Sequence, residues 1–207
     1  GHADARSLLG DPMNKEDRGT MSGNMVSIYA SRGGVGKSFI AVNLAVNLHL
    51  ETREQVLLLD FTRPYSIDLA GMLELEKVNS LESVLPNAVR LNAAVLKTFV
   101  TRHPCGIDLL ALSSARKQSF LKPEPLNLRA ALSKLITAYG YVVVDCGTAF
   151  DDATAALLDL SSLILTVAAP DYLSMQHAYG DLAMLRNQNF SQEMVKLLFN
   201  FDGLRED

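Results

Sequence analysis

A glycine-rich turn between an apolar run and a helical pattern constrains the fold more than any other part of the sequence. Residues 26–30 are mostly apolar, and they lead directly into SRGGVGKS at positions 31–38. Apolar residues three and four apart follow over positions 38–50, which predicts a helix. Glycines that join a strand to a helix N-terminus turn backbone N–H groups inward and bind phosphate oxygens. The sequence therefore predicts a phosphate-binding loop.

Apolar runs and helical patterns continue to alternate along the chain. Several runs are apolar throughout, as expected for strands buried on both faces of a parallel sheet. The predicted strands cover 26–30, 56–60, 107–112, 141–145, 163–168 and 195–200. The predicted helices cover 38–50, 126–139, 151–160 and 174–187, with shorter ones at 66–73, 80–85 and 92–99. This alternation predicts a doubly wound α/β fold with a mostly parallel sheet, helices on both faces and ligands at the carboxyl ends of the strands.

Three polar residues stand where predicted strands end. Asp60 and Asp145 each close an apolar run, so we expect both at the sheet edge that carries the loop. Asn200 closes the last run, and its amide carries both a hydrogen-bond donor and an acceptor. Turn formation is an alternative role for all three, because Asp and Asn are frequent in turns.

Charge and cysteine content exclude several classes of protein. The net charge is -4 and no run of Lys or Arg forms a basic stripe, which disfavours DNA as a ligand. Cys105 and Cys146 lie far apart without a metal-binding motif, so neither a disulfide framework nor a zinc site is indicated. No apolar run approaches the roughly 20 residues that cross a bilayer. We expect a soluble, cytoplasmic chain.

The ends of the chain differ from its middle. Gly1-His2 is typical of a tag remnant, and the polar residues that follow are typical of a linker. We therefore predict a tag remnant and flexible linker over 1–24 and one nucleotide-binding domain over 25–207. The chain stops soon after the last predicted strand, so we expect a domain truncated at its C-terminus.

The loop and the helix after it resemble the deviant Walker A motif of the ParA/MinD ATPases, and the resemblance extends over residues 25–200. Ala41-Val42-Asn43-Leu44-Ala45 is similar to the first helix of that family. The resemblance implies a P-loop NTPase fold of the SIMIBI type, ATP or ADP with Mg²⁺ as ligands, and a homodimer. The nucleotide-binding residues that it implies are Gly33, Gly34, Val35, Gly36, Lys37, Ser38, Phe39 and Asn200. The implied metal ligands are Ser38, Asp145 and Asp60, and the implied catalytic residues are Lys37, Arg32 and Asp60.

Two positions depart from the family pattern. Arg32 occupies the place of the leading lysine, which in the family reaches the nucleotide of the partner subunit; its planar fork differs in shape from an ammonium. Thr62 occupies the place of the second aspartate, which positions the attacking water. A threonine hydroxyl is no useful base near neutral pH. We therefore expect binding with weak or absent hydrolysis.

The succession of looser motifs resembles the TadZ/CpaE branch of the family. These motifs lie at 66–70, 80–85, 105–110 and 150–154. The branch implies pilus or secretion components as partners and recruitment to the cell pole or the inner membrane face, with any membrane association made through partners.

Other functions stay open on the sequence alone. A partition-type ATPase would ride on DNA and needs surface Lys and Arg. A bacterial tyrosine kinase is suggested by Asp60 with Arg63-Pro64, although such enzymes carry a tyrosine-rich tail. If the loop is only a flexible turn with an incidental lysine, the chain is a scaffold that binds no nucleotide.

Overall fold

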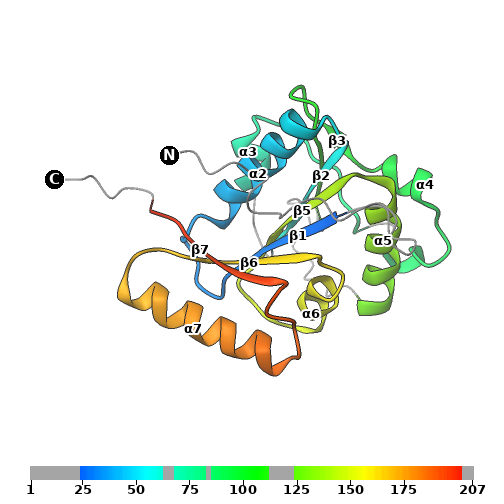
Figure 1. Ribbon diagram of the computed structural model, residues 1–207. Coiled ribbons are helices and arrows are strands. Elements are labelled where there is room, and N and C mark those ends of the chain that lie inside the picture. Colours follow the sequence, from blue (N-terminus) through cyan, green and yellow to red (C-terminus); the bar gives the residue numbers. More distant parts are fainter. Residues whose placement is uncertain (1–23, 63–67, 83–84, 112–123, 202–207) are drawn as a thin grey trace.

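One sheet organises the fold. The computed structural model describes residues 24–62, 68–82, 85–111 and 124–201, and within these ranges seven strands pair in the order β3-β4-β2-β5-β1-β6-β7 (Figure 1). All neighbouring strands run parallel except β3 and β4. The predicted doubly wound α/β fold is confirmed.

The elements follow one another as strand and helix along most of the chain. The strands are β1 (Asn24–Tyr29), β2 (Val56–Phe61), β3 (Thr101–Arg102), β4 (Asp108–Ala111), β5 (Tyr141–Cys146), β6 (Leu163–Ala168) and β7 (Val195–Phe199). The helices are α2 (Lys37–Thr52), α3 (Asp68–Met72), α4 (Ala93–Lys97), α5 (Pro125–Ala138), α6 (Asp152–Leu158) and α7 (Tyr172–Asn187), with a short 3₁₀ helix η1 (Leu85–Asn87).

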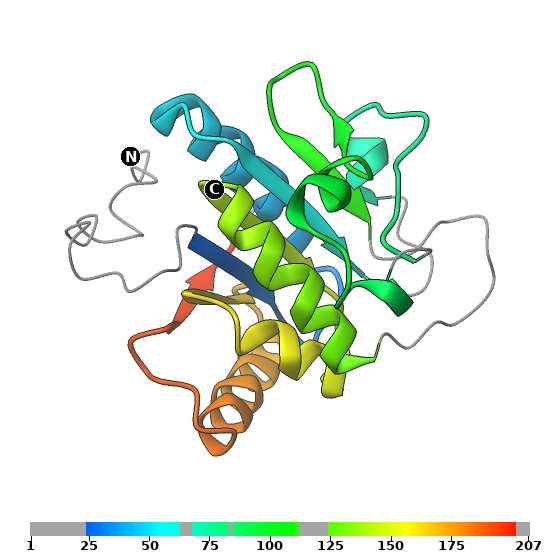
Figure 2. The same ribbon diagram turned by 90° about the vertical axis from the view of Figure 1, so that its right-hand side faces the viewer.

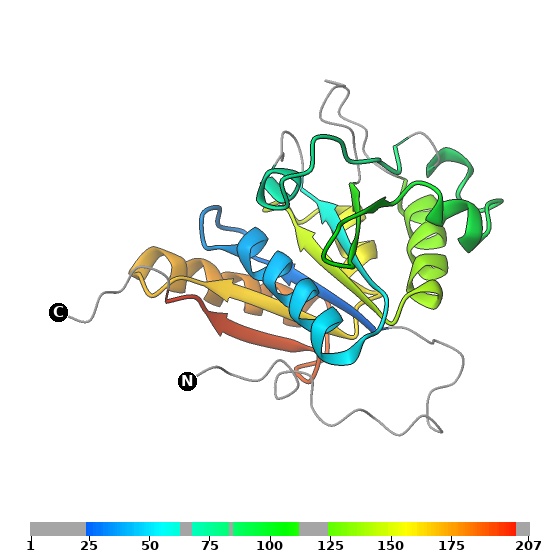
Figure 3. The ribbon, with the colours of Figure 1, turned by 90° about the horizontal axis from the view of Figure 1, so that it is seen from above.

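The two faces of the sheet each carry an apolar core. The strands β2 and β6 are buried along their whole length, so their side chains reach both cores. Helices α2 and α3 cover one face, where Leu44 and Leu48 pack against β1 and β5 residues (Figure 3). Helices α4, α5, α6 and α7 cover the other face, and Figure 2 shows α5 lying across it. Burial on both faces is why these strands are apolar rather than alternating.

Some local predictions were wrong. The predicted helix at 80–85 is replaced, in the residues described, by a bridge between Ser80 and Ala111 and by η1. Strand β3 was not predicted, because two residues leave no periodic pattern to read. The strand predicted at 107–112 begins at Asp108, and residue 112 lies outside the described ranges, as do 1–23 and 66–67.

A polar network connects the β3 edge of the sheet to α4 and to the C-terminal end of α5. Asp108, at the start of β4, is nearly buried and accepts hydrogen bonds from the Tyr139 hydroxyl (2.8 Å) and Arg102 Nη1 (3.0 Å). The Lys97 ammonium of α4 lies 4.4 Å from the centre of the Tyr139 ring. Burial, together with the bond to Asp108, raises the pKa of Tyr139 far above its ordinary value. The hydroxyl therefore stays a donor to Asp108.

Removal of this hydroxyl should destabilise the fold. Tyr139→Phe leaves a buried carboxylate oxygen without its donor, so we expect the free energy of unfolding in urea to fall by about 1–3 kcal/mol. Tyr141→Phe is the control, because the described part of the chain holds no hydrogen-bond partner for the Tyr141 hydroxyl. Equal losses in the two variants would contradict a specific role for the Asp108 contact.

Candidate functional site

The loop between β1 and α2 takes a backbone conformation that requires glycine. Gly34 has φ 78° and Gly36 has φ 90°, both in the left-handed region that residues with a Cβ rarely adopt. Gly36 is also the N-cap of α2. A Cβ on Gly36 would lie 2.2 Å from Asn200 Nδ2, so both conformation and space require glycine there. The predicted strand, loop and helix are thus present.

Lys37 lies inside the loop, where the sequence placed the central cation. Its side chain is almost buried, and its Nζ donates to the Arg32 carbonyl at 3.1 Å. Burial lowers the pKa of Lys37, and the negative charge of Asp145 opposes that shift. The lysine is therefore held against the loop backbone at the N-terminus of α2.

The predicted metal ligands meet at the carboxyl edge of the sheet. Ser38 Oγ, in the first turn of α2, donates to Asp145 Oδ2 at 2.5 Å. Asp145 is fully buried and pairs in register with Asp60 on the neighbouring strand β2. Parallel pairing thus brings together residues that are 85 apart in the numbering.

These oxygens suit Mg²⁺. The ion prefers hard oxygen ligands and is usually held by one or two carboxylates together with substrate phosphates. In the described ranges no group of three His, Cys, Asp or Glu side chains forms a metal site by itself. A hydroxyl and a buried carboxylate at a phosphate loop fit an ion that phosphates help to hold.

Thr62 makes contacts that the sequence did not reveal. Its backbone N–H donates to Asp60 Oδ1 at 3.0 Å and its hydroxyl donates to the same oxygen at 2.5 Å. Thr62 orients the carboxylate of Asp60 at the end of β2.

Asn200 lies at the loop, as its predicted site role requires, but it contacts the protein itself. Its Nδ2 donates to the Val35 carbonyl at 3.0 Å, and its backbone N–H donates to the Ala168 carbonyl at 2.8 Å. The side chain therefore supports the loop from the end of β7. Phe39, in the first turn of α2, is 54% exposed.

Helix α7 and its N-cap residue contact the phosphate loop, and no sequence motif predicted these contacts. Asp181 Oδ2, nearly buried, accepts from the Ser31 backbone N–H at 2.9 Å, and His177 Nδ1 lies 3.2 Å from Ser31 Oγ. Arg32 Nη1 donates to Asp171 Oδ1 at 2.5 Å. The loop and the first turn of α7 lie at the same end of the sheet (Figures 1 and 3). The only sequence signal was Asp171 itself, a helix-capping residue type.

A strand, a loop with left-handed glycines and a helix N-terminus in a mostly parallel sheet define the P-loop NTPase class. A family model described as an AAA domain matches residues 23–193. The chain therefore belongs to this AAA-domain family.

Individual relatives are distant. The septum site-determining protein MinD of Thermotoga maritima is 24% identical over 179 residues, which cover 86% of this chain and 64% of MinD. The chain thus spans less than two thirds of that relative.

Solved structures share the fold. A ParA family ATPase from Chlorobium tepidum superposes with a TM-score of 0.76 at 23% identity, covering 86% of this chain and 73% of the other. MinD of Pyrococcus horikoshii, complexed with Mg-ADP, gives a TM-score of 0.67 at 19% identity, covering 88% of this chain and 72% of the other.

Within the described residues, no helix has the length and apolar character needed to cross a membrane.

Gly36→Ala should destabilise the nucleotide-free protein. The substitution forces a left-handed conformation on alanine and displaces the Asn200 amide, so we expect the free energy of unfolding to fall by about 1–3 kcal/mol. Gly33→Ala is the control, because a Cβ on Gly33 meets nothing within 4 Å. Urea unfolding without nucleotide measures both, and an equal loss in the two variants would show that the Gly36 geometry is not required.

Proposed function

We propose that this chain is an ATP-binding switch or scaffold whose nucleotide-gated dimer localises and helps assemble a pilus or secretion apparatus. The observation that carries the proposal is the phosphate loop itself. Left-handed glycines place Lys37 and Ser38 at the N-terminus of α2, with Ser38 Oγ 2.5 Å from the buried Asp145. Such a helix terminus stabilises polyphosphate through its orphan N–H groups and its partial positive charge.

In this proposal each loop residue binds a different part of the nucleotide or its metal ion. The backbone N–H groups of residues 33–39 surround the phosphates, and Lys37 leaves the Arg32 carbonyl to neutralise the terminal phosphates. Ser38, Asp145 and Asp60 would hold Mg²⁺. The ion supplies charge neutralisation of the phosphates when it is bound. Asn200 contacts the adenine edge, which requires its amide to share or leave the Val35 carbonyl.

Weak or absent hydrolysis follows from the end of β2. Activation of water needs a group that accepts its proton, and a threonine hydroxyl does not do so near neutral pH. Thr62 instead donates twice to Asp60 Oδ1. Asp60 is thereby oriented by its neighbour, and no second carboxylate stands at position 62. Nucleotide therefore serves mainly to hold a conformation or an assembly.

The dimer and the pilus role rest on different support. A nucleotide drives dimerisation only through stronger binding to the dimer than to the monomer. Arg32, at the edge of the loop, is proposed to contribute to the nucleotide of a second copy. The pilus or secretion partner is supported by the order of motifs at 66–70, 80–85, 105–110 and 150–154, which resembles the TadZ/CpaE branch. We propose that any recruitment to the cell pole or membrane is made by such partners.

Calorimetry with ATP and Mg²⁺ tests nucleotide binding. Lys37→Ala removes the cation inside the loop, so we expect ATP affinity to fall at least about tenfold. Lys134→Ala is a matched control, since Lys134 Nζ also donates to main-chain carbonyls, those of Ala88 and Val89 on the second face. Wild-type protein that binds neither ATP nor ADP is a nucleotide-free scaffold, and the proposal is then wrong.

The same samples separate the remaining functions. Sedimentation with saturating Mg-ATP should show a dimer. Retention on non-specific DNA at low salt would instead support a partition-type ATPase. Formation of phosphotyrosine would support a tyrosine kinase.

Thr62→Asp should raise hydrolysis. The variant places a carboxylate where a water-orienting group is expected, and such groups contribute a factor of about 100 or more, so we expect phosphate release from ATP to rise at least about tenfold. Thr62→Ser, which keeps the hydroxyl that bonds Asp60, should leave the rate unchanged. If Thr62→Asp binds ATP normally and hydrolyses no faster, Thr62 is not the reason for weak turnover.

A further inference from the structure

The first two residues of the phosphate loop are attached to one helix, α7. The Ser31 backbone N–H donates to Asp181 and the Arg32 guanidinium donates to Asp171. Asp181 lies within α7 and Asp171 is its N-cap, although 150 and 139 residues separate these carboxylates from Ser31 and Arg32. These contacts attach the start of the loop to α7 at two points, its N-cap and its interior.

The pair of Arg32 and Asp171 is more than an incidental surface contact. Asp181 is nearly buried and fixes the backbone of Ser31, the residue before Arg32, so the origin of the Arg32 side chain is set. Asp171 is fixed as well, because its Oδ1 caps α7 by accepting from the Ser174 backbone N–H at 3.0 Å. The guanidinium bond holds the pKa of Asp171 below its usual range. Both ends of the ion pair are thus anchored by other contacts.

A nucleotide at the loop would change the balance of charge around Arg32. The guanidinium side chain is 32% exposed and its residue lies within the phosphate loop. A polyphosphate carries more negative charge than one carboxylate, and guanidinium groups bind phosphate bidentately. ATP and Asp171 would therefore compete for the same cation.

We propose that Asp171 is a positioning residue for nucleotide binding, which holds Arg32 against α7 until nucleotide phosphates draw the guanidinium away. The proposal rests on the proposed function, since it requires a polyphosphate within reach of Arg32, either at its own loop or, in the proposed dimer, at the loop of a second copy. It adds that binding breaks the contact of Arg32 with α7. ATP occupancy is thereby coupled to the exposed first turn of α7, which carries Tyr172 and Met175.

Calorimetry on Asp171→Asn tests this competition. Asparagine keeps the helix cap but removes the charge that holds Arg32. Because exposed ion pairs contribute little, we expect Mg-ATP to bind about two- to fivefold more tightly, with a smaller gain for ADP and none for adenosine. In an Arg32→Ala background, Asp171→Asn should change ATP affinity no further.

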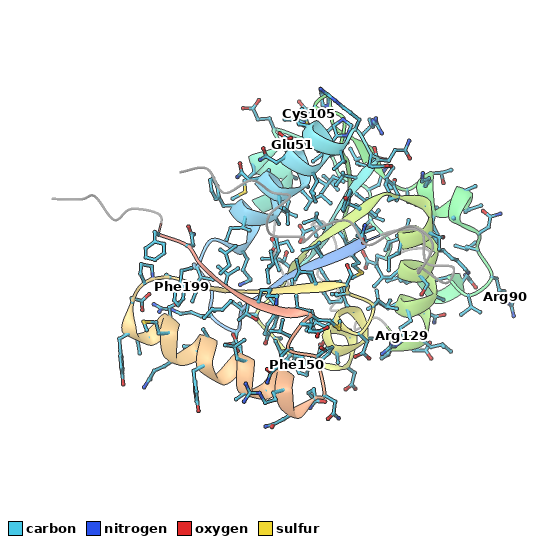
Figure 4. All side chains as sticks on the ribbon, in the orientation of Figure 1. Glu51, Arg90, Cys105, Arg129, Phe150 and Phe199 are labelled. Atoms are coloured by element: carbon cyan, nitrogen blue, oxygen red, sulfur yellow. The ribbon has the colours of Figure 1, made fainter. Side chains whose placement is uncertain are left out.

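Asp159→Asn is the matched control. Asp159 pairs with Arg129 of α5 at similar exposure, and Arg129 lies on the opposite side of the molecule from the first turn of α7 (Figure 4). This variant should bind ATP as the wild type does. Hydrogen exchange over residues 172–176 provides a second measurement, and ATP should raise it in the wild type but not in Asp171→Asn.

Several results would overturn the proposal. An unchanged or lower ATP affinity in Asp171→Asn contradicts a competition for Arg32. A gain that persists in the Arg32→Ala background shows simple repulsion between Asp171 and phosphate, without a positioning role. Failure of the wild type to bind ATP removes the proposed function itself, whereas normal binding without an effect of Asp171→Asn removes only this inference.

Discussion

The candidate site depends on one residue in a left-handed conformation at the mouth of α2. Gly36 ends the turn from β1, caps the helix and leaves just enough room for the side chain of Asn200. A Cβ at this position would strain the left-handed turn at the helix cap and collide with the amide of Asn200. The end of β7 is therefore attached to a loop that stands 164 positions earlier in the chain. Local backbone geometry at a single glycine thus sets the packing of distant elements.

Parallel strand register does the rest of the assembly. β1 lies between β5 and β6, and β2 pairs with β5, so the loop and both strand-end carboxylates meet at one edge. The buried Asp145 favours a nearby positive charge, while burial disfavours the charged form of Lys37. The site holds opposed charges under partial desolvation. A charged, multidentate ligand is suited to such an environment, because it adds partners to groups that have already left water.

The sequence predicted those parts of the protein that local patterns encode. Strands buried on both faces give continuous apolar runs, helices give periodic ones, and the loop at 31–38 needs its glycines in a fixed order. The contacts of Asp181 and Asp171 with the loop could not be predicted, because they are long-range contacts and no local sequence pattern encodes them. Thr62 was predicted only as a lost aspartate, since hydrogen bonds to Asp60 depend on side-chain geometry. Strand β3 was not predicted, because its two residues are too few to form a recognisable pattern.

The position of Asn200 has a consequence for how the site loosens. It follows β7, which in the described residues has β6 as its single neighbour and exposes Leu197 and Phe199. Outermost strands fray at much lower free energy than central ones. Local unfolding of β7 would break the hydrogen bond between Asn200 and the Val35 carbonyl of the loop, while β1, β2 and β5 stay folded. A ligand held at this loop would therefore be sensitive to the opening of an edge strand, well before global unfolding.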